Sequence, residues 1–320
     1  MFIKELPVHD YDAYRDLVGS EGNVFNTLEW LRIYENIKIF GIYENSKLLI
    51  GGFSFASRRV FNFRVFQNPP FTPYIGPFFR RQSSSRSKKN NEIKRILSGV
   101  AEFFRSSKNA LTYLAFSPDI IDFQPFLWEK FHVSPNYTYI LDLSKTEQEL
   151  FDAMSSERRN DIRKAIHDGL RCEFVTDQNQ VKHLILKTFQ RNKKTIPVRF
   201  IDKILFQYAK PDNSYSIVTF NDGKPVAGCF CVYDSCTSYY LMSGYDDGNK
   251  HHGAGALALW HAIQHAKSLN LKRFDFEGSM IKPIEKYFRG FGGELAPYFR
   301  ISRANFGLEV ILKIKYRTYF

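Results

Sequence analysis

Hydrophobic and polar positions alternate with a period of two near the start of the chain, in residues 37–43 (IKIFGIY) and 47–56 (KLLIGGFSFA). This period is typical of β-strands, and the short polar turn at 44–46 between the two runs predicts a hairpin. A basic, serine-rich stretch at 80–91 (RRQSSSRSKKNN) predicts a mobile surface loop. The helical pattern of residues 93–107 follows and leads into a further strand.

Two helices are predicted in the middle of the chain from their end signals. Thr146 and Glu149 have the spacing of a capping box, in which each side chain satisfies a free N–H group at a helix start. A second helix begins at about Ser156, with Ile162 on its apolar face. We expect this helix to end at Gly169, because glycine is a common C-terminal cap.

An antiparallel meander follows these helices. Two apolar runs, 215–220 (YSIVTF) and 225–233 (PVAGCFCVY), flank an Asp-Gly pair at 222–223. Such a pair is a strong hairpin signal, because the tight turn needs positive φ. A third strand, a helix at 254–269 and a strand at 272–279 (KRFDFEGS) complete the pattern.

The two halves of the chain share an order of elements, namely hairpin, linking loop, helix and strand, which favours a duplicated fold. A chain of 320 residues also exceeds the roughly 100–200 residues that are usual for one domain. We therefore expect two α/β domains, residues 1–135 and 136–320, each with a mixed twisted sheet flanked by helices.

Composition indicates a folded and basic protein. Hydrophobic residues make up 44% of the chain, with 31 Phe and 18 Tyr, and such a composition excludes a disordered protein. The 45 Lys and Arg exceed the 33 Asp and Glu, for a net charge of +12. This charge favours anionic partners such as nucleotide phosphates, tRNA, pyrophosphate-linked lipids or a negatively charged leaflet. An ordinary basic surface is the alternative.

Cysteine usage and the absence of long apolar runs bear on location. Cys172, Cys229, Cys231 and Cys236 form no disulfide framework for so large a chain and lack the spacing of a zinc site, so a reduced compartment fits. No stretch has the length of a signal peptide or of a membrane span, so we expect a cytoplasmic protein. The basic amphipathic segment 306–320 could contact the inner face of the membrane or dock as a terminal helix.

A glycine-containing segment, 250–255 (KHHGAG), lies at the start of the helix predicted at 254–269. Free N–H groups at a helix start attract phosphate oxygens. Lys250, Gly253 and Gly255 are therefore candidates for binding a phosphate-bearing cofactor. The alternative is that the two glycines serve helix packing alone.

Two carboxylates, Asp275 and Glu277, alternate with phenylalanines along the strand predicted at 272–279. We expect both to lie on one face of that strand. They are candidates to receive or orient an attacking amine. The alternative is a structural ion pair with nearby basic residues.

A basic stripe follows one face of the helix predicted from Ser156. Arg159, Arg163 and His167 recur every four residues, and Arg158 and Lys164 flank them. Arg159, Arg163 and Lys164 are candidates to clamp substrate phosphates, arginine by bidentate hydrogen bonds. A solvated helix face is the alternative.

Five segments together resemble one protein family. They are 274–279 (FDFEGS), 287–293 (YFRGFGG), 155–169 (SSERRNDIRKAIHDG), 25–30 (FNTLEW) and 73–77 (PYIGP). They resemble the Fem peptidyltransferases (FemABX) and the related FemAB-like N-acyltransferases of the acetyltransferase (GNAT) superfamily. The resemblance covers nearly the whole chain, and the first two segments are its most specific part.

What the resemblance implies is tandem GNAT-like domains that form amide bonds. In the Fem enzymes an aminoacyl-tRNA donates an amino acid to an amine of a peptidoglycan precursor, an intermediate of the cell wall. Phe288 and Arg289 match the family's Phe-Lys pair, which acts near the donor ester, so the resemblance makes them candidate catalytic residues. Arginine suits oxyanion stabilisation better than proton transfer, because it keeps its proton at ordinary pH. Tyr74 and Ser279, within matching segments, are candidate substrate-binding residues, although the loop of Tyr74 could also serve rigid packing.

Three functions follow as hypotheses. The first is a Fem-like transferase, in which the amine of a UDP- or lipid-linked muropeptide attacks an acyl or aminoacyl donor in a cleft between the domains. The second is an N-acyltransferase that uses acyl-coenzyme A on a small amine or aminosugar. The third is a non-catalytic protein that presents a basic groove to RNA or anionic lipid. We expect aminoacyl-tRNA or acyl-coenzyme A as an exchangeable co-substrate, and no tightly bound cofactor or metal.

Overall fold

The computed structural model describes residues 1–45, 47–60, 62–81, 83, 85–191, 197–278 and 280–315. Contacts group the chain into two compact units, the first made of Met1–Asn136 with Pro297–Phe320 and the second of Tyr137–Ala296. The domain ranges predicted from the sequence, 1–135 and 136–320, differ from these units at the C-terminal end. The reason is that Arg300–Ala304 pair with a strand of the first unit.

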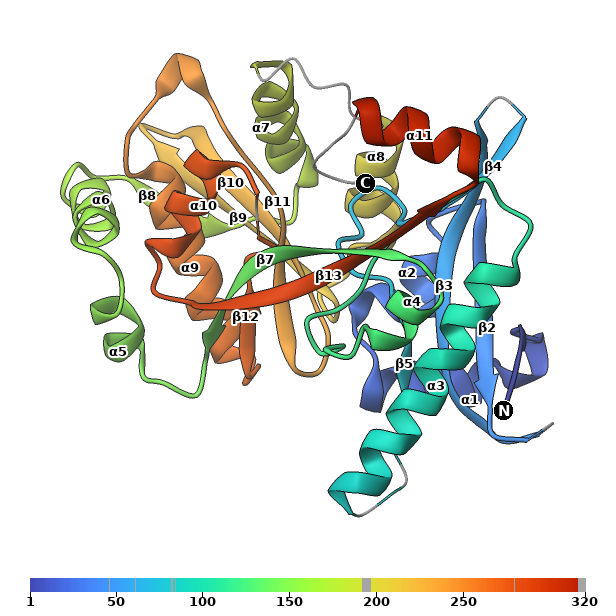
Figure 1. The fold of residues 1–320 in the computed structure, drawn as a ribbon. Coiled ribbons are helices and arrows are strands. Elements are labelled where there is room, and N and C mark those ends of the chain that lie inside the picture. Colours follow the sequence, from blue (N-terminus) through green and yellow to red (C-terminus); the bar gives the residue numbers. More distant parts are fainter. Residues whose placement is uncertain are drawn as a thin grey trace. The chain divides into compact units, whose positions relative to one another are not determined.

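The first unit is built on one mixed sheet (Figure 1). Its strands lie in the order β1 (Phe2–Glu5), β2 (Ile37–Tyr43), β3 (Leu49–Val60), β4 (Phe63–Gln67), β6 (Leu111–Ala115) and β13 (Glu294–Ala304), and β5 (Phe78–Phe79) pairs with β3. Neighbouring strands are antiparallel except for β4 and β6. The hairpin predicted at 37–56 is confirmed as β2 and β3.

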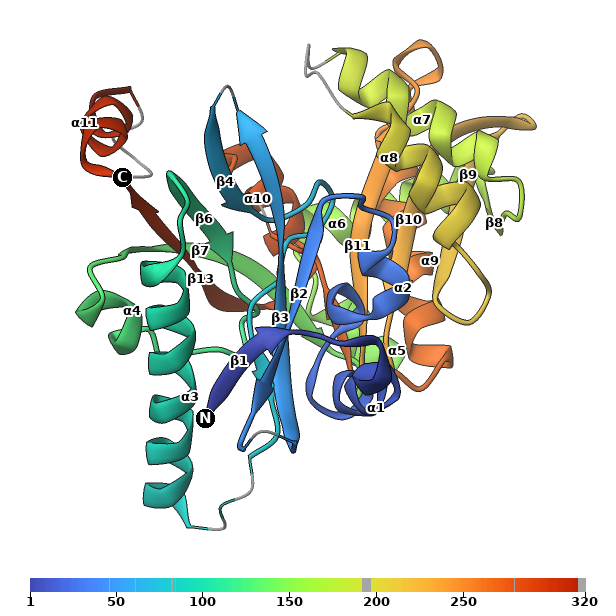
Figure 2. The same ribbon diagram turned by 90° about the vertical axis from the view of Figure 1, so that its right-hand side faces the viewer.

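Helices cover both faces of this sheet. They are η1 (Val8–Asp10), α1 (Tyr11–Glu21), η2 (Val24–Asn26), α2 (Leu28–Leu31), α3 (Arg86–Ser106) and α4 (Gln124–Trp128). In Figure 2, α3 lies on one side of β2 and β3, and α1 and α2 lie on the other. On the α3 side, Phe103 and Phe104 pack against Phe40, Phe53 and Phe55 of the strands.

Helix α3 begins earlier than the sequence pattern predicts. The surface loop predicted at 80–91 is wrong for its second half, because α3 starts at Arg86. The Ser85 hydroxyl accepts a hydrogen bond from the Lys88 N–H group and caps the helix, as serine commonly does. The first turns carry only exposed polar side chains, and the buried face begins at Ile96.

The second unit also contains strands paired in both directions. Its strands lie in the order β7 (His132–Asp142), β12 (Arg273–Asp275), β11 (Thr237–Tyr245), β10 (Lys224–Tyr233), β9 (Ser214–Asn221) and β8 (Arg171–Phe174). All neighbours are antiparallel except β11 and β12. The predicted Asp-Gly hairpin is confirmed between β9 and β10, with positive φ at Asp222 and Gly223.

Helices also pack on both faces of the second sheet. They are α5 (Glu147–Asp152), α6 (Ser156–His167), α7 (Gln178–Arg191), α8 (Val198–Asp202), η3 (Lys203–Tyr208), η4 (Asp247–Asn249), α9 (Ala254–Ser268) and α10 (Lys282–Arg289). Helix α9 packs with Cys229 and Cys231 of β10 in one core. Helix α7 approaches Gly228, the residue directly before Cys229. Since successive residues of a strand face opposite sides, the two helices cover opposite faces of the sheet.

Several local predictions in this unit are confirmed. Thr146 and Glu149 form the capping box at the start of α5. Helix α6 spans Ser156–His167, and Gly169 follows it with a φ of +83°. Cys229 and Cys231 are free and fully buried, as expected for cysteines that act as small hydrophobic residues.

The strand predicted at 272–279 is shorter than expected. Strand β12 ends at Asp275, and both Glu277 and Gly278 have positive φ. A turn therefore replaces the regular alternation that would have put Asp275 and Glu277 on one face. A side chain at Gly278 would clash with the carbonyl oxygen of Tyr137, only 2.0 Å from the Cβ position.

The C-terminal segment contains helix α11 (Phe306–Lys315). Residues 316–320, the end of the predicted amphipathic segment, lie outside the described residues. Within the described part of the chain, no helix combines the length and the apolar character needed to cross a bilayer.

Candidate functional site

Strands β11 and β12 separate at one end of their pairing. They are hydrogen-bonded in parallel only from Thr237 opposite Arg273 to Tyr239 opposite Asp275. Strand β12 then ends, while β11 continues to Tyr245 and carries a bulge opposite Phe230 and Cys231 of β10. A cavity of about 620 Å³ lies along this continuation of β11. Its volume is in the range of small-molecule sites in proteins.

The cavity is enclosed by β10, β11 and the helices α6, α7, α9 and α10 of the second unit. Its described lining residues are Arg158, Thr188, Arg191, Val226, Gly228, Tyr240, Ser243, Gly244, Tyr245, Asp246, Lys250, His251, His252, Gly255, Ala256, Pro283, Ile284, Tyr287 and Phe288. Aromatic rings from β11 and α10 form one part of the wall, and basic side chains form another. Such a lining suits a ligand with an apolar part and an anionic part.

The first turn of α9 supplies backbone donors to the cavity. Gly253 is the N-cap, and no side chain caps the helix. The Gly253 N–H group donates to Nδ1 of His251, and the Ala254 N–H group donates to the His251 carbonyl. The N–H groups of Gly255 and Ala256 have no acceptor among the described residues, and both residues line the cavity. Free N–H groups at a helix start favour an anion.

The two glycines of the 250–255 segment have different roles. A Cβ atom at Gly253 would lie 2.0 Å from the carbonyl oxygen of Asp161 on α6. Gly253 is therefore required by the close packing of α9 on α6. A Cβ atom at Gly255 would meet only the Tyr287 hydroxyl, at 3.5 Å. Gly255 instead keeps the cavity beside α9 open.

Arg158 is the most deeply buried cation of the cavity, with a side chain only 8% exposed. Its guanidinium is 2.8 Å from Asp161 and 2.6 Å from Glu157, and it lies 4.8 Å from the centre of the Tyr287 ring. Asp161 also contacts Nδ1 of His252 at 2.8 Å. This network fixes α6 and the start of α9 around the buried charge.

Two further cations belong to the cavity, Arg191 of α7 and Lys250 of the loop before α9. Arg191 pairs with Asp247 at 2.9 Å and lies 3.9 Å from the centre of the Tyr245 ring. Lys250 is exposed and has no carboxylate partner within the described part of the chain. Lys250 is therefore the basic side chain best able to reach an incoming anion.

The titratable groups of the cavity are held in defined states. Burial raises the pKa of Tyr240 and of Tyr287, so both phenols are neutral hydrogen-bond donors. Asp246 is hydrogen-bonded by Lys187, Asn249 and the Gly248 N–H group, which lowers its pKa to about 2. Asp246 is therefore an anion whose charge is already compensated.

The basic stripe predicted on α6 is not part of this lining. Arg159 donates to the carbonyl groups of Asp152 and Met154, at 2.8 and 2.6 Å. Arg163 lies over the Phe151 ring, and Lys164 pairs with Asp168 at 2.6 Å. These contacts tie α6 to its neighbours. Arg158 is the cation of α6 that lines the cavity, and it lies on the opposite side of the helix from this stripe. Only the burial pattern of α6 could have indicated it.

The two predicted acidic residues are in different environments. Asp275 is 2% exposed and accepts hydrogen bonds from the Thr138 hydroxyl at 2.6 Å and from the Glu277 N–H group at 2.8 Å. Glu277 retains some exposed surface as a residue, but its Oε1 atom is buried and has no hydrogen-bond partner among the described residues. Burial, with the nearby charge of Asp275, raises the pKa of Glu277. Neither carboxylate belongs to the described lining of the cavity.

The remaining predicted residues are divided between the cavity and other places. Phe288 lines the cavity and packs on Tyr240. Arg289 is 61% exposed and pairs with Glu285 at 2.9 Å. Tyr74 is 1% exposed and packs against Phe25 in the core of the first unit, so the structure gives no support to its predicted contact with a substrate. Ser279 lies outside the described residues.

Comparison with known proteins finds a family model that matches part of this chain and several similar structures. Residues 156–289 match the sequence model of the acetyltransferase (GNAT) domain. A search of curated proteins gave no match. FemX has a similar structure, with a TM-score of 0.63 and 12% identity over 93% of this chain and 97% of that chain. The C-terminal domain of a putative lysylphosphatidylglycerol synthetase from Agrobacterium fabrum has a TM-score of 0.59 and 12% identity over 95% of both chains.

A tandem GNAT protein from the clavulanic acid biosynthesis pathway is also similar, with a TM-score of 0.50 and 10% identity over 84% of this chain and 82% of that chain. At these identities the likeness concerns the fold. The predicted fold class, tandem GNAT-like domains with mixed sheets flanked by helices, is confirmed, and so is the resemblance to the FemABX type. The cavity described above lies within the matched region, because all of its described lining residues fall between 156 and 289.

Proposed function

We propose that this protein is an N-acyltransferase of the Fem type, which moves an acyl or aminoacyl group from a phosphate-bearing donor to an amine. The observation that carries the proposal is the start of α9. There the N–H groups of Gly255 and Ala256 and the ammonium of Lys250, which have no partner among the described residues, meet at one cavity. These groups would bind the donor phosphate by charge and by directed hydrogen bonds.

The wall of the cavity suits the acyl-bearing part of such a donor. Tyr240, Tyr287 and Phe288 offer aromatic surface, and the two phenols donate hydrogen bonds without carrying charge. In the proposed reaction the neutral amine attacks the carbonyl carbon of an ester or thioester. The new C–N bond replaces the C–O or C–S bond, and the amine proton passes to a base. Holding both reactants in place would supply much of the rate.

The acceptor is proposed from the resemblance to the Fem enzymes. It is the amine of a peptidoglycan precursor, such as a UDP- or lipid-linked muropeptide, and aminoacyl-tRNA would then be the donor. The excess of basic residues, with a net charge of +12, supports a phosphate-rich donor and acceptor. This acceptor also agrees with a cytoplasmic protein that works close to the inner face of the membrane.

The second candidate function is acyl transfer from acyl-coenzyme A to a small amine or aminosugar. The observation that favours it is the same helix start, because a pyrophosphate group can use two adjacent free N–H groups. A non-catalytic protein with a basic groove for RNA or anionic lipid is the third. It would bind with steep salt dependence and would transfer no group from any donor.

Donor binding is tested directly by calorimetry with acetyl-coenzyme A and with an aminoacylated minihelix RNA. We expect saturable binding of one of them. Lys250→Ala should weaken this binding about tenfold, because one charge-assisted contact to phosphate is lost. The control is Lys224→Ala, which removes an exposed lysine from the β9–β10 turn and leaves the cavity intact. If neither donor binds the wild-type protein, or if both variants behave alike, the proposed donor site is wrong.

Acceptor identity is tested by transfer assays with the donor that binds. UDP-muropeptides and small aminosugars are supplied in parallel, and the acylated product is identified by mass spectrometry. A product formed only on the muropeptide supports the Fem-type acceptor. A product formed only on the aminosugar replaces it with the second candidate function.

Arg289 remains in the proposal as the residue that would stabilise the oxyanion near the donor ester. Arg289→Ala should lower kcat by about 100-fold, the usual size of the loss of one such contact. Stability should change little, because the ion pair with Glu285 is largely exposed. The control is Lys286→Ala, which removes another exposed cation from the same helix. An unchanged kcat in Arg289→Ala removes this residue from the mechanism.

Glu277 is proposed as the carboxyl group that receives the proton of the amine, because burial raises its pKa. A carboxyl group whose folded pKa is raised stabilises the protein below its unfolded pKa, and this contribution is lost as pH rises through the folded pKa. Glu277→Gln avoids this loss. The Tm of the variant relative to wild type should therefore increase as the pH rises above the ordinary pKa of a glutamate, about 4.3.

The control for this measurement is Glu294→Gln, which changes an exposed carboxylate. Its Tm difference from wild type should stay constant over the same pH range. A constant difference for Glu277→Gln as well would mean that Glu277 titrates as an ordinary surface carboxylate. That result would remove the physical basis for its role as a base.

A further inference from the structure

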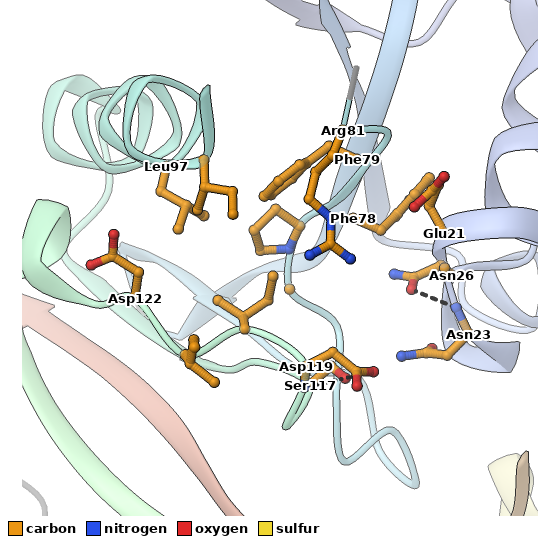
Figure 3. A pocket seen from close by; sticks show the side chains of 16 residues that line it. Glu21, Asn23, Asn26, Phe78, Phe79, Arg81, Leu97, Ser117, Asp119 and Asp122 are labelled. Carbon is orange, nitrogen blue, oxygen red and sulfur yellow. Dashed lines mark hydrogen bonds between the residues drawn. The ribbon is translucent and has the colours of Figure 1, made fainter. Parts of the chain in front are cut away.

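A second cavity, of about 150 Å³, lies in the first unit, far along the chain from the GNAT domain (Figure 3). It is formed by the end of α1, by η2, by β5 and the residues around it, by α3 and by the loop after β6. Its described lining residues are Glu21, Gly22, Asn23, Asn26, Gly76, Pro77, Phe78, Phe79, Arg81, Ile93, Leu97, Ser117, Asp119, Ile120, Ile121 and Asp122. The proposed acyl transfer uses none of them.

Asn26 presents an unsatisfied donor to this cavity. The residue is 2% exposed, and its Oδ1 atom accepts a hydrogen bond from the Asn23 N–H group at 3.2 Å. This bond fixes which end of the amide is oxygen. The Nδ2 atom is buried without a hydrogen-bond partner among the described residues, and in Figure 3 it points into the cavity. An unpaired buried amide nitrogen is costly, so an acceptor atom of a ligand is expected there.

Arg81 adds a positive charge on the same side. Figure 3 shows its guanidinium pointing into the cavity that Asn26 also lines. Among the described residues no carboxylate pairs with Arg81, whereas its neighbour Arg80 lies 4.0 Å from Glu21. A guanidinium and an amide nitrogen that line the same cavity offer it several N–H donors, and such donors suit a carboxylate.

Negative and apolar groups complete the lining. Glu21 and Asp119 also bring carboxylates to the lining of the cavity (Figure 3). Asp122 is already paired with Lys94 at 2.5 Å. Around these polar groups the wall is apolar, formed by Pro77, Phe78, Phe79, Ile93, Leu97, Ile120 and Ile121. The small volume excludes a nucleotide and fits a compact molecule.

We propose that this cavity binds a small zwitterion, namely an α-amino acid with an apolar side chain. The carboxylate would accept hydrogen bonds from Arg81 and from Nδ2 of Asn26. The ammonium group would face the carboxylates of Glu21 and Asp119, and the side chain would lie against the phenylalanine and isoleucine residues. This site is independent of the donor cavity of the second unit, so its test does not depend on acyl transfer.

The experiment is calorimetric titration of the full chain with L-alanine, L-valine, L-leucine, L-isoleucine and L-phenylalanine. For the best ligand, the matching amide and the matching deaminated acid are titrated as well. Both analogues should bind at least about tenfold more weakly, because each lacks one charged group. If none of the five amino acids binds, or if either analogue binds as well as its parent, the proposal is overturned.

Variants locate the binding. Arg81→Met removes the guanidinium of an exposed residue. This change should weaken binding at least about tenfold. Arg80→Met is the matched control, because Arg80 is exposed but absent from the described lining, and it should bind as wild type does. Equal losses in both variants would overturn the proposal.

A change at Asn26 tests the buried donor separately. Asn26→Asp keeps the oxygen that accepts from Asn23 and replaces Nδ2 by a second oxygen. We expect a further loss of affinity, because this oxygen would repel the carboxylate of the ligand. A circular dichroism spectrum and Tm close to those of wild type establish that the variant is folded. Wild-type affinity in a folded Asn26→Asp protein would overturn the proposal, and Arg81→Met decides the question if the variant does not fold.

Discussion

The cavity of the second unit depends on one close approach, between Gly253 and the backbone of α6 at Asp161. The contact leaves no space for any side chain, so it fixes the distance between α6 and the start of α9. Because α9 is held there, the N–H groups of Gly255 and Ala256 are directed into the cavity and not into the interface between the helices. Arg158 strengthens the same junction from α6 through Asp161, which also contacts His252. The close approach of Gly253 to Asp161 thus determines both how the two helices pack and where the N–H groups that would attract an anion lie.

Much of the fold could be predicted from the sequence, because its signals are local. The hairpin of β2 and β3 follows from alternation, and the positive φ at Asp222 and Gly223 follows from an Asp-Gly pair. The capping box of α5 has its own spacing. The 250–255 segment was also predicted to lie at a helix start, which is confirmed, and the packing alternative applies to only one of its glycines. Gly253 is a packing residue, and Gly255 is the one that lines the cavity.

The rest could not be predicted, because it depends on which face of an element turns inward. Arg158 and Arg159 are adjacent in the sequence, yet one lines the cavity and the other binds carbonyl groups of the preceding turn. The sequence of this basic helix does not show which of the two arginines faces the cavity, because that depends on where α9 and α10 lie. The strand expected through Glu277 fails for a similar reason, since the approach of Gly278 to Tyr137 forces a turn. The unpaired Nδ2 atom of Asn26 is a property of the assembled first unit alone.

The first unit is made of two separate parts of the chain, and this affects how the protein is made. Strand β13 supplies a neighbour to β6, so residues 1–136 alone lack one strand of their own sheet. The second unit is continuous, from Tyr137 to Ala296. During translation the ribosome therefore releases every residue of the second unit before the last strand of the first. Until β13 is synthesised, one edge of β6 has no neighbouring strand, and an open sheet edge is prone to wrong association. A chaperone that shields nascent chains would have to cover residues 1–136 until the last strand of the first unit is synthesised.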